Sequence, residues 1–111
     1  MKASRPIHPG EILREDFLPD YDLSAGALAK AIGAPRDRLE KIIRESRAVT
    51  ADTAARLARY FGTNPQFWLN LQANFDLAQV DPVTLADILP IQTQTSHSAG
   101  LQEEAAPFTR K

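Results

Sequence analysis

The sequence predicts an all-α fold, and three observations support this prediction. Apolar residues recur three and four positions apart, a spacing that places them on one face of a helix. Proline, glycine and capping residues divide residues 1–89 into segments of helical length. No segment alternates apolar and polar residues as a β-strand does. We therefore expect one helical domain at residues 1–89 and a polar, flexible tail at residues 90–111, whose few apolar residues cannot offset the cost of ordering it.

The first predicted helix begins at Pro9, because the fixed φ of proline suits the first helical position. Ile12, Leu13 and Phe17 then recur at helical spacing and are expected to face the core. Pro19 is expected to end this helix, since proline has no amide hydrogen and restricts the residue before it.

The second and third predicted helices are bounded by capping residues. Ser24 suits the N-cap of the second helix, because its hydroxyl can accept from an amide of the next turn. Gly33 is expected to end that helix, since glycine tolerates a left-handed backbone. The third helix is predicted from Pro35 to about Glu45.

Three further helices are predicted after residue 49. Thr50 caps the fourth, which is expected to close at Gly62. Asn64 caps the fifth, which carries an apolar edge of Trp68, Leu71 and Phe75. Asp81 caps a short sixth helix, which can extend to Leu89 before Pro90 stops it.

Charge is distributed unevenly along the chain. The 111 residues include 13 Lys and Arg and 14 Asp and Glu side chains, for a net charge of −1. Residues 30–59 nevertheless hold eight basic and four acidic side chains, while both flanks are acidic, and no Lys or Arg occurs between Arg59 and Arg110. Such a positive block can bind a polyanion whatever the total charge. The plainer interpretation is an ordinary solvated face, and charge alone does not choose between the two.

Several classes of protein are excluded or disfavoured. The absence of cysteine excludes a disulfide framework and a cysteine zinc site and suits the cytoplasm. No stretch approaches the roughly 18 apolar residues of a membrane span. The only histidines, His8 and His97, are far apart in sequence, so His8 is expected to be a helix-start residue rather than part of a metal site. The carboxylates Glu11, Glu15 and Asp16 have no nucleophile beside them in the sequence, so we expect no enzyme, metal, cofactor or small-molecule substrate.

Residues 25–45 have the spacing of a helix-turn-helix motif. Such a motif needs a small residue where the second helix crosses the first, a glycine at the turn, and apolar residues that hold the second helix to the core. The chain meets these needs at Leu28, Ala29, Ile32, Gly33, Ala34, Leu39 and Ile42. The spacing resembles that of phage-repressor-like (XRE-type) regulators, and this resemblance implies a five-helix domain of their kind. Those repressors usually open the first motif helix with a Gln that contacts DNA phosphate, whereas this chain has Ala25 there.

The second motif helix is predicted to read bases in the major groove of DNA. Arginine can form two hydrogen bonds to guanine O6 and N7, and lysine can contact the same atoms less rigidly. The predicted base-reading side chains are Arg36, Asp37, Arg38 and Lys41. The predicted phosphate contacts, which position the protein without specifying sequence, come from Ser24, Arg44, Arg47 and Thr50.

The acidic residues on this helix need an explanation, because a carboxylate facing phosphate is repelled. One alternative is pairing along the helix, of Asp37 with Lys41 and of Glu40 with Arg44, each four residues apart. The other is that Asp37 accepts a hydrogen bond from a cytosine amino group. We favour pairing.

Longer runs of the chain resemble HigA-type antitoxins of bacterial toxin–antitoxin modules. The resemblance covers about residues 5–77 and rests on the runs at residues 6–13 (PIHPGEIL), 50–54 (TADTA), 56–61 (RLARYF) and 67–72 (FWLNLQ). It implies a homodimer that binds a palindromic operator in its own promoter, on the bacterial nucleoid. It also implies a partner toxin of the RelE-like class, which cleaves mRNA on ribosomes and is held inactive. The acidic residues Asp76, Asp81 and Asp87 would then either limit nonspecific DNA affinity or offer a basic toxin an acidic surface.

The aromatic edge of the fifth helix has two interpretations. Phe67, Trp68 and Leu71 are candidates for a dimer interface, but an aromatic edge on a short helix is more often part of the core. Core packing is favoured for Trp68, and Phe67 is the better candidate for an interface because it points elsewhere on the helical wheel.

Two alternatives to an antitoxin remain open on the sequence. A stand-alone transcription regulator would have the same fold, and the presence or absence of a toxin gene next door distinguishes it. A protein-interaction module that has lost DNA binding is suggested by Ala25 and by the acidic residues of the third helix. Salt-independent association would favour that module.

Overall fold

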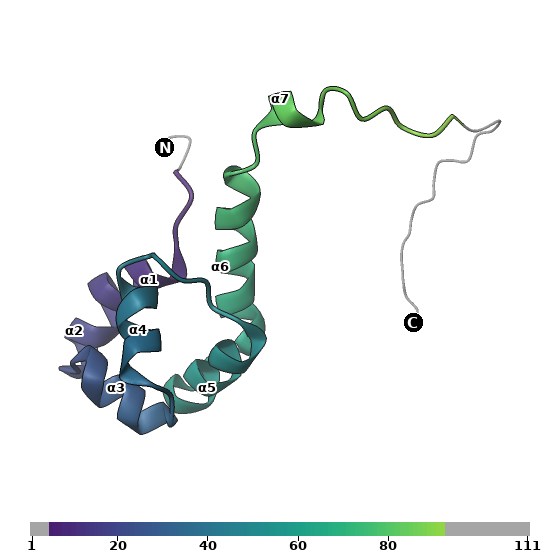
Figure 1. The fold of residues 1–111 in the computed structure, drawn as a ribbon. Coiled ribbons are helices and arrows are strands. Elements are labelled where there is room, and N and C mark those ends of the chain that lie inside the picture. Colours follow the sequence, from purple (N-terminus) through teal and green to yellow (C-terminus); the bar gives the residue numbers. More distant parts are fainter. Residues whose placement is uncertain (1–4, 93–111) are drawn as a thin grey trace. The chain divides into compact units, whose positions relative to one another are not determined.

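Capping residues determine where the helices of the first unit begin. The computed structural model describes residues 5–92, and the chain divides into two units, Met1–Val80 and Asp81–Lys111. The first unit holds α1 (Pro9–Ile12), η1 (Leu13–Phe17), α2 (Leu18–Tyr21), α3 (Ala25–Ile32), α4 (Arg36–Ile43), α5 (Ala51–Phe61) and α6 (Pro65–Ala78) (Figure 1). The side chains of Ser24, Thr50 and Asn64 each accept a hydrogen bond from an amide of the helix that follows, as predicted. No strand occurs within residues 5–92, so the all-α prediction is confirmed.

The first predicted helix does not end at Pro19. The segments α1, η1 and α2 follow one another without a break, and η1 is a π-helical turn in which the amide of Leu18 bonds to the carbonyl of Leu13. Pro19 lies inside α2, and the helix ends only at Asp22, whose φ of 53° is left-handed. A wider turn before a proline reduces the clash of its ring with the preceding turn, which explains why the helix continues.

Two other helix ends differ from the prediction. The third predicted helix ends at Ile43 rather than near Glu45, because Arg44 has left the helical backbone and Glu45 is left-handed with a φ of 65°. In the second unit, α7 (Pro82–Leu85) is one turn long and does not extend to Leu89. Asp81 caps α7 as predicted, through a hydrogen bond from the amide of Val83. Most of the predicted tail lies outside the described residues, and its boundary after residue 89 stays a prediction.

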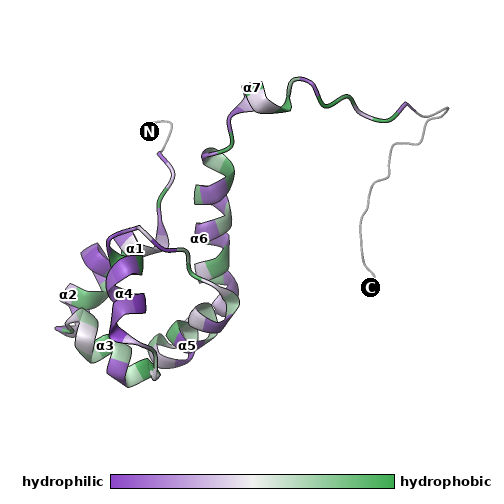
Figure 2. Cartoon of the chain, in the orientation of Figure 1, coloured by the Kyte–Doolittle hydropathy of each residue, from purple (hydrophilic) through white to green (hydrophobic). Residues whose placement is uncertain are grey.

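The core of the first unit is formed by the apolar faces of its helices. The buried apolar side chains are Leu13, Leu28, Ala29, Ile32, Leu39, Ile42, Val49, Ala54, Leu57, Ala58 and Trp68. Figure 2 shows the contrasting pattern on α4, most of whose residues are hydrophilic. The core therefore fixes α4 by two residues, Leu39 and Ile42, and leaves its polar side chains toward solvent.

Close backbone packing joins α1 to α4. A Cβ atom added at Gly10 would lie 1.8 Å from the carbonyl oxygen of Ile42, so only glycine allows this approach. Arg14 strengthens the same junction, because its guanidinium donates to the carbonyl of Ile43 and to the carboxylate of Glu45. The C-terminal end of α4 is therefore held against the first helical segment. No helix within residues 5–92 is long and apolar enough to cross a membrane.

Candidate nucleic-acid interface

The segments α3 and α4 form the two helices of a helix-turn-helix. Gly33 makes the turn with a left-handed φ of 68°, and the amide of Ala34 donates to the carbonyl of Ala29 at 2.9 Å. Ala29 is buried where α3 and α4 pack together, and Leu39 and Ile42 are fully buried on the inner face of α4. Each of these residues has the role that the sequence spacing predicted, so the motif at residues 25–45 is present in the structure.

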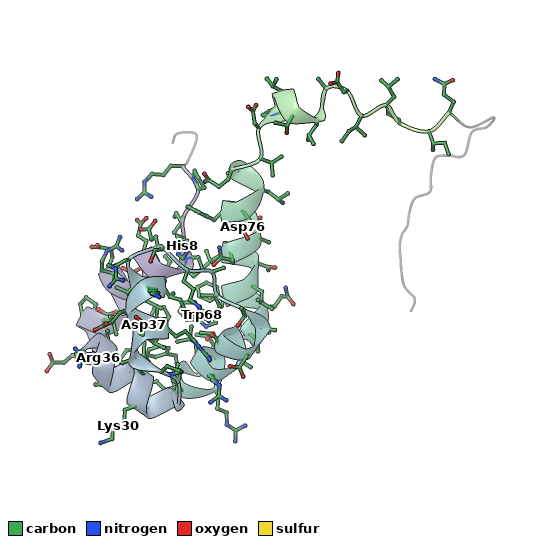
Figure 3. The ribbon with its side chains drawn as sticks, in the orientation of Figure 1. His8, Lys30, Arg36, Asp37, Trp68 and Asp76 are labelled. Carbon is green, nitrogen blue, oxygen red and sulfur yellow. The ribbon has the colours of Figure 1, made fainter. Side chains whose placement is uncertain are left out.

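The outer face of α4 carries two ion pairs side by side. The guanidinium of Arg36 lies 2.8 Å from the carboxylate of Glu40, and the ammonium of Lys41 lies 3.1 Å from the carboxylate of Asp37. Arg36 and Asp37 are labelled in Figure 3, and their side chains are 72% and 68% exposed. Exposed pairs of this kind contribute about 0–1 kcal/mol, so they open easily for a stronger partner.

The pairing expected for Glu40 is wrong, whereas the pairing of Asp37 with Lys41 is confirmed. Glu40 binds Arg36, four residues earlier, and not Arg44. The reason is that Arg44 is the C-cap residue, with φ −82° and ψ 0°, so its side chain no longer follows the helical i,i+4 geometry. The contact of Asp37 with cytosine stays a prediction.

Arg38 lies apart from the other predicted base-reading residues. Its side chain is only 24% exposed, and its Nη1 donates to Asp52 at 3.0 Å and to Thr53 at 3.4 Å, both in the first turn of α5. Its Nε is buried and has no partner within residues 5–92. Arg38 therefore reaches DNA only by releasing Asp52, whereas Arg36 and Lys41 already lie on the exposed face.

Asp52 and Arg56 of α5 connect that helix to both helices of the motif. Besides Arg38 from α4, Asp52 accepts from Arg56 of α5 at 3.1 Å. Arg56 in turn donates to the carbonyls of Ile32 and Gly33 at the end of α3, at 2.9 and 3.3 Å. The hydrogen bonds from Arg56 and then Arg38 lower the pKa of Asp52 below its ordinary value. Sequence reasoning missed this network; its only local signal is the i,i+4 spacing of Asp52 and Arg56.

The predicted phosphate-contacting residues surround the motif. Ser24 and Thr50 are the N-caps of α3 and α5, and each hydroxyl accepts from a backbone amide of its helix. The hydroxyl of Ser24 still has its hydrogen to donate, for example to a phosphate oxygen, whereas the hydroxyl of Thr50 donates to that of Thr53 at 3.4 Å and must release it first. Arg44 and Arg47 are exposed in the connection between α4 and α5. All four side chains lie on segments that adjoin α4 or its partner helix.

The aromatic edge of α6 divides as the sequence suggested. Trp68 is fully buried, and its indole Nε1 donates to the hydroxyl of Thr63 at 2.8 Å, so it belongs to the core and offers no surface to a second copy. Phe67 is 39% exposed and Leu71 is half-buried, so these two candidates stay available for a dimer interface. Figure 3 shows Trp68 among the helices of the first unit.

The part of the chain that the structure describes contains no cluster of side chains that could bind a metal ion. No three His, Cys, Asp or Glu side chains of residues 5–92 are placed to hold a metal ion. His8 is the N-cap of α1, as expected, and its Nδ1 accepts from the amide of Gly10 at 2.9 Å.

Comparison with known proteins gives a consistent result. No family model matches the chain. It is 52% identical over 89 residues to virulence-associated protein I of Dichelobacter nodosus, covering 78% of this chain and 82% of that protein. A Pseudomonas aeruginosa protein solved with its 28-base-pair operator DNA is 45% identical, with a TM-score of 0.72, and matches 78% of this chain and 100% of the solved chain. The P. aeruginosa antitoxin HigA, solved with the higBA promoter, is 44% identical, with a TM-score of 0.69, over 79% of this chain and 100% of the solved one.

The fold and the site define a helix-turn-helix protein with an exposed, polar second motif helix. The identities and the coverage then place it more narrowly. The chain belongs to the HigA-type antitoxin family of helix-turn-helix proteins. Its relatives include proteins named as an antitoxin and as transcriptional regulators, in agreement with the expectation from sequence that the chain is not an enzyme.

Proposed function

We propose that this chain is an antitoxin that represses its own operon. It binds a palindromic operator as a homodimer and neutralises a RelE-like, mRNA-cleaving toxin in the bacterial cytoplasm. The observation that carries the DNA-binding part is the exposed α4 face, with Arg36 and Lys41, on a helix-turn-helix of a family whose members have been solved with operator and promoter DNA.

The free energies involved favour a contact of Arg36 with DNA over its ion pair on α4. Opening the exposed pair of Arg36 with Glu40 costs about 1 kcal/mol at most. A bidentate contact of arginine with guanine contributes about 1–3 kcal/mol of discrimination against the wrong base. Arg36 therefore exchanges Glu40 for a base on binding, and Asp37 keeps Lys41 paired or contacts cytosine itself. Arg38 contributes second, because it must first leave Asp52.

Substitutions on α4 test this proposal. A labelled fragment of the chain's own promoter is titrated with the wild type and with the double variant Arg36→Ala/Arg38→Ala, which should lose specific binding. Arg59→Ala is the matched control, because it removes an exposed positive charge from α5 instead of α4. Circular dichroism verifies that each variant folds. A double variant with unchanged operator affinity would contradict the assignment of α4 as the reading helix.

The homodimer and the toxin each have a direct measurement. A palindromic operator requires two copies of α4, and the exposed Phe67 of α6 is our candidate contact between them. Light scattering should show that the wild type is a dimer and that Phe67→Ala dissociates at a higher protein concentration.

The toxin is tested by co-expression. If a RelE-like toxin gene lies beside the gene of this chain, the growth arrest that the toxin causes should be relieved when the two are expressed together. Absence of such a gene would leave the stand-alone regulator as the function.

A further inference from the structure

The second unit exposes an unusual run of aliphatic side chains. Among the described residues from Asp81 onward, Val83, Leu85, Ile88, Leu89 and Ile91 are between 49% and 87% exposed. Figure 3 shows the side chains of this segment standing clear of the ribbon. Large exposed aliphatic residues gathered in one short segment are typical of a surface that another protein covers. The first unit, in contrast, buries most of its aliphatic side chains in one core.

The local structure of this segment is an unfinished helix. Asp81 caps α7 through its carboxylate and carbonyl, which accept from the amide of Val83 at 2.9 Å and the hydroxyl of Thr84 at 2.7 Å. The helix nevertheless stops at Leu85, four residues before the predicted end. Continued to residue 89, it would place Leu85, Ile88 and Leu89 at i, i+3 and i+4, on one face.

The apolar face explains why the helix is unfinished. A short helix is marginal in water and gains most of its stability from packing its apolar face. Asp87 falls on the opposite side of the same helix, next to Val83, and its charge suits that side to solvent. Pro90 sets the furthest point that the helix can reach. A partner that covers Leu85, Ile88 and Leu89 would supply the missing packing.

The charge of the segment indicates which partner fits. No Lys or Arg occurs from residue 60 to residue 109, and Asp81 and Asp87 make the segment acidic. A protein that cleaves mRNA must attract a polyanion, so the surface around its active site is positive. The acidic segment is complementary to such a surface. A second copy of the segment has the same sign of charge and is a poorer match.

We propose that residues 82–89 complete a helix on the toxin, with Leu85, Ile88 and Leu89 buried in an apolar groove beside the positive RNA-binding surface. This is helix-in-groove recognition, in which i, i+3 and i+4 side chains act as anchors. The inference rests on the proposed function, because it assigns the toxin-binding segment of the same antitoxin. Asp81 prepares the helix by fixing its first turn.

The test uses the full-length chain and a catalytically inactive form of the RelE-like toxin encoded beside it. Calorimetry or biolayer interferometry should report that Leu85→Ala/Ile88→Ala/Leu89→Ala lowers toxin affinity by about 100-fold or more, as expected for three anchor side chains. Val83→Ala is the matched control, because an equally exposed aliphatic residue is removed from the opposite side. It should change the affinity by about 3-fold or less. Asp81→Asn/Asp87→Asn should slow association in low salt.

Two further measurements separate the possible outcomes. Backbone NMR shifts of residues 86–89 should become helical when the toxin is added, and operator affinity should be equal in the triple variant and the wild type. A triple variant that binds toxin as tightly as the wild type overturns the inference and leaves the proposed function intact. Wild-type chain that does not bind toxin, or a genome without the toxin gene, overturns both. Loss of the dimer in the triple variant overturns the inference in favour of a second copy of this chain.

Discussion

At the scale of single residues, His8 combines a capping role with a buried ring. Its Nδ1 accepts from the amide of Gly10, and its ring meets that of Phe75 edge to face, with 4.9 Å between the centroids. Burial lowers the pKa of His8 below its ordinary value, against the opposing charges of Glu45 and Asp76. The folded chain therefore favours the neutral imidazole, which is also the form whose Nδ1 can accept.

This lowered pKa predicts how stability varies with pH. Unfolding returns His8 to water, where its pKa is about 6.5, so below that pH the unfolded chain binds more protons than the folded chain. The contribution is full above about pH 6.5 and is lost as the pH falls from there toward the lowered pKa. His8→Asn keeps an oxygen that can accept from Gly10 but does not titrate. Urea unfolding between about pH 5 and 7.5 should give the variant a lower free energy of unfolding that depends less on pH than that of the wild type. An equal pH dependence in the two proteins would contradict this assignment.

At the scale of elements, the contact of α1 with α4 fixes the reading helix. Gly10→Ala should destabilise the fold by about 3 kcal/mol or more, because the new Cβ meets a backbone carbonyl that cannot move away cheaply. Gly26→Ala is the matched control: its Cβ would meet the flexible Arg36 side chain at 3.4 Å, an ordinary contact. Alanine favours helix over glycine by up to about 1 kcal/mol, so the control should be neutral or stabilising. Chemical unfolding measures the free energy of unfolding of both variants. Equal changes in the two would contradict the close approach of Gly10 to the carbonyl of Ile42.

Local chemistry explains which elements the sequence predicted well. A cap such as Ser24 or Thr50 bonds within its own helix, so the residue type alone identifies the helix start. Gly33 at the motif turn is predictable for the same reason, because few other residues adopt its backbone. These local signals were sufficient to locate α3, α4 and α5, and with them the candidate reading face.

The features that sequence reasoning missed depend on tertiary neighbours. Arg38 binds Asp52, 14 positions away, and Arg14 reaches Glu45, 31 positions away, and no periodic pattern encodes either pair. Pro19 failed as a stop signal because the π-helical turn before it accommodates the ring. The predicted helix to Leu89 failed for the opposite reason, since its apolar face has nothing within residues 81–92 to pack against.

At the scale of the whole molecule, the net charge of −1 is a poor guide to DNA binding. The positive block at residues 30–59 includes the exposed residues Arg36, Lys41, Arg44 and Arg47, all on or beside α4. Arg38 and Arg56 belong to the same block, but the ion pair of Arg38 with Asp52 connects α4 to α5, and Arg56 connects α5 to the end of α3. The block therefore contains both side chains that face solvent and side chains that position them.

This division predicts distinct salt responses for two classes of variant. Each phosphate that the protein neutralises contributes about 0.9 to the slope of log affinity against log salt, and a dimer doubles the effect of one substitution. Arg47→Ala, which removes a predicted phosphate contact, should lower the slope by about 1.8 and weaken specific and nonspecific DNA about equally. Arg36→Ala should instead lower the ratio of specific to nonspecific affinity, because it removes a base contact. Fluorescence anisotropy over a salt series with operator and scrambled DNA measures both quantities.

Two outcomes would contradict this division. If Arg47→Ala leaves the salt slope unchanged, Arg47 does not contact DNA phosphate. If binding by the wild type does not depend on salt, a protein-interaction module is favoured over an operator-binding antitoxin.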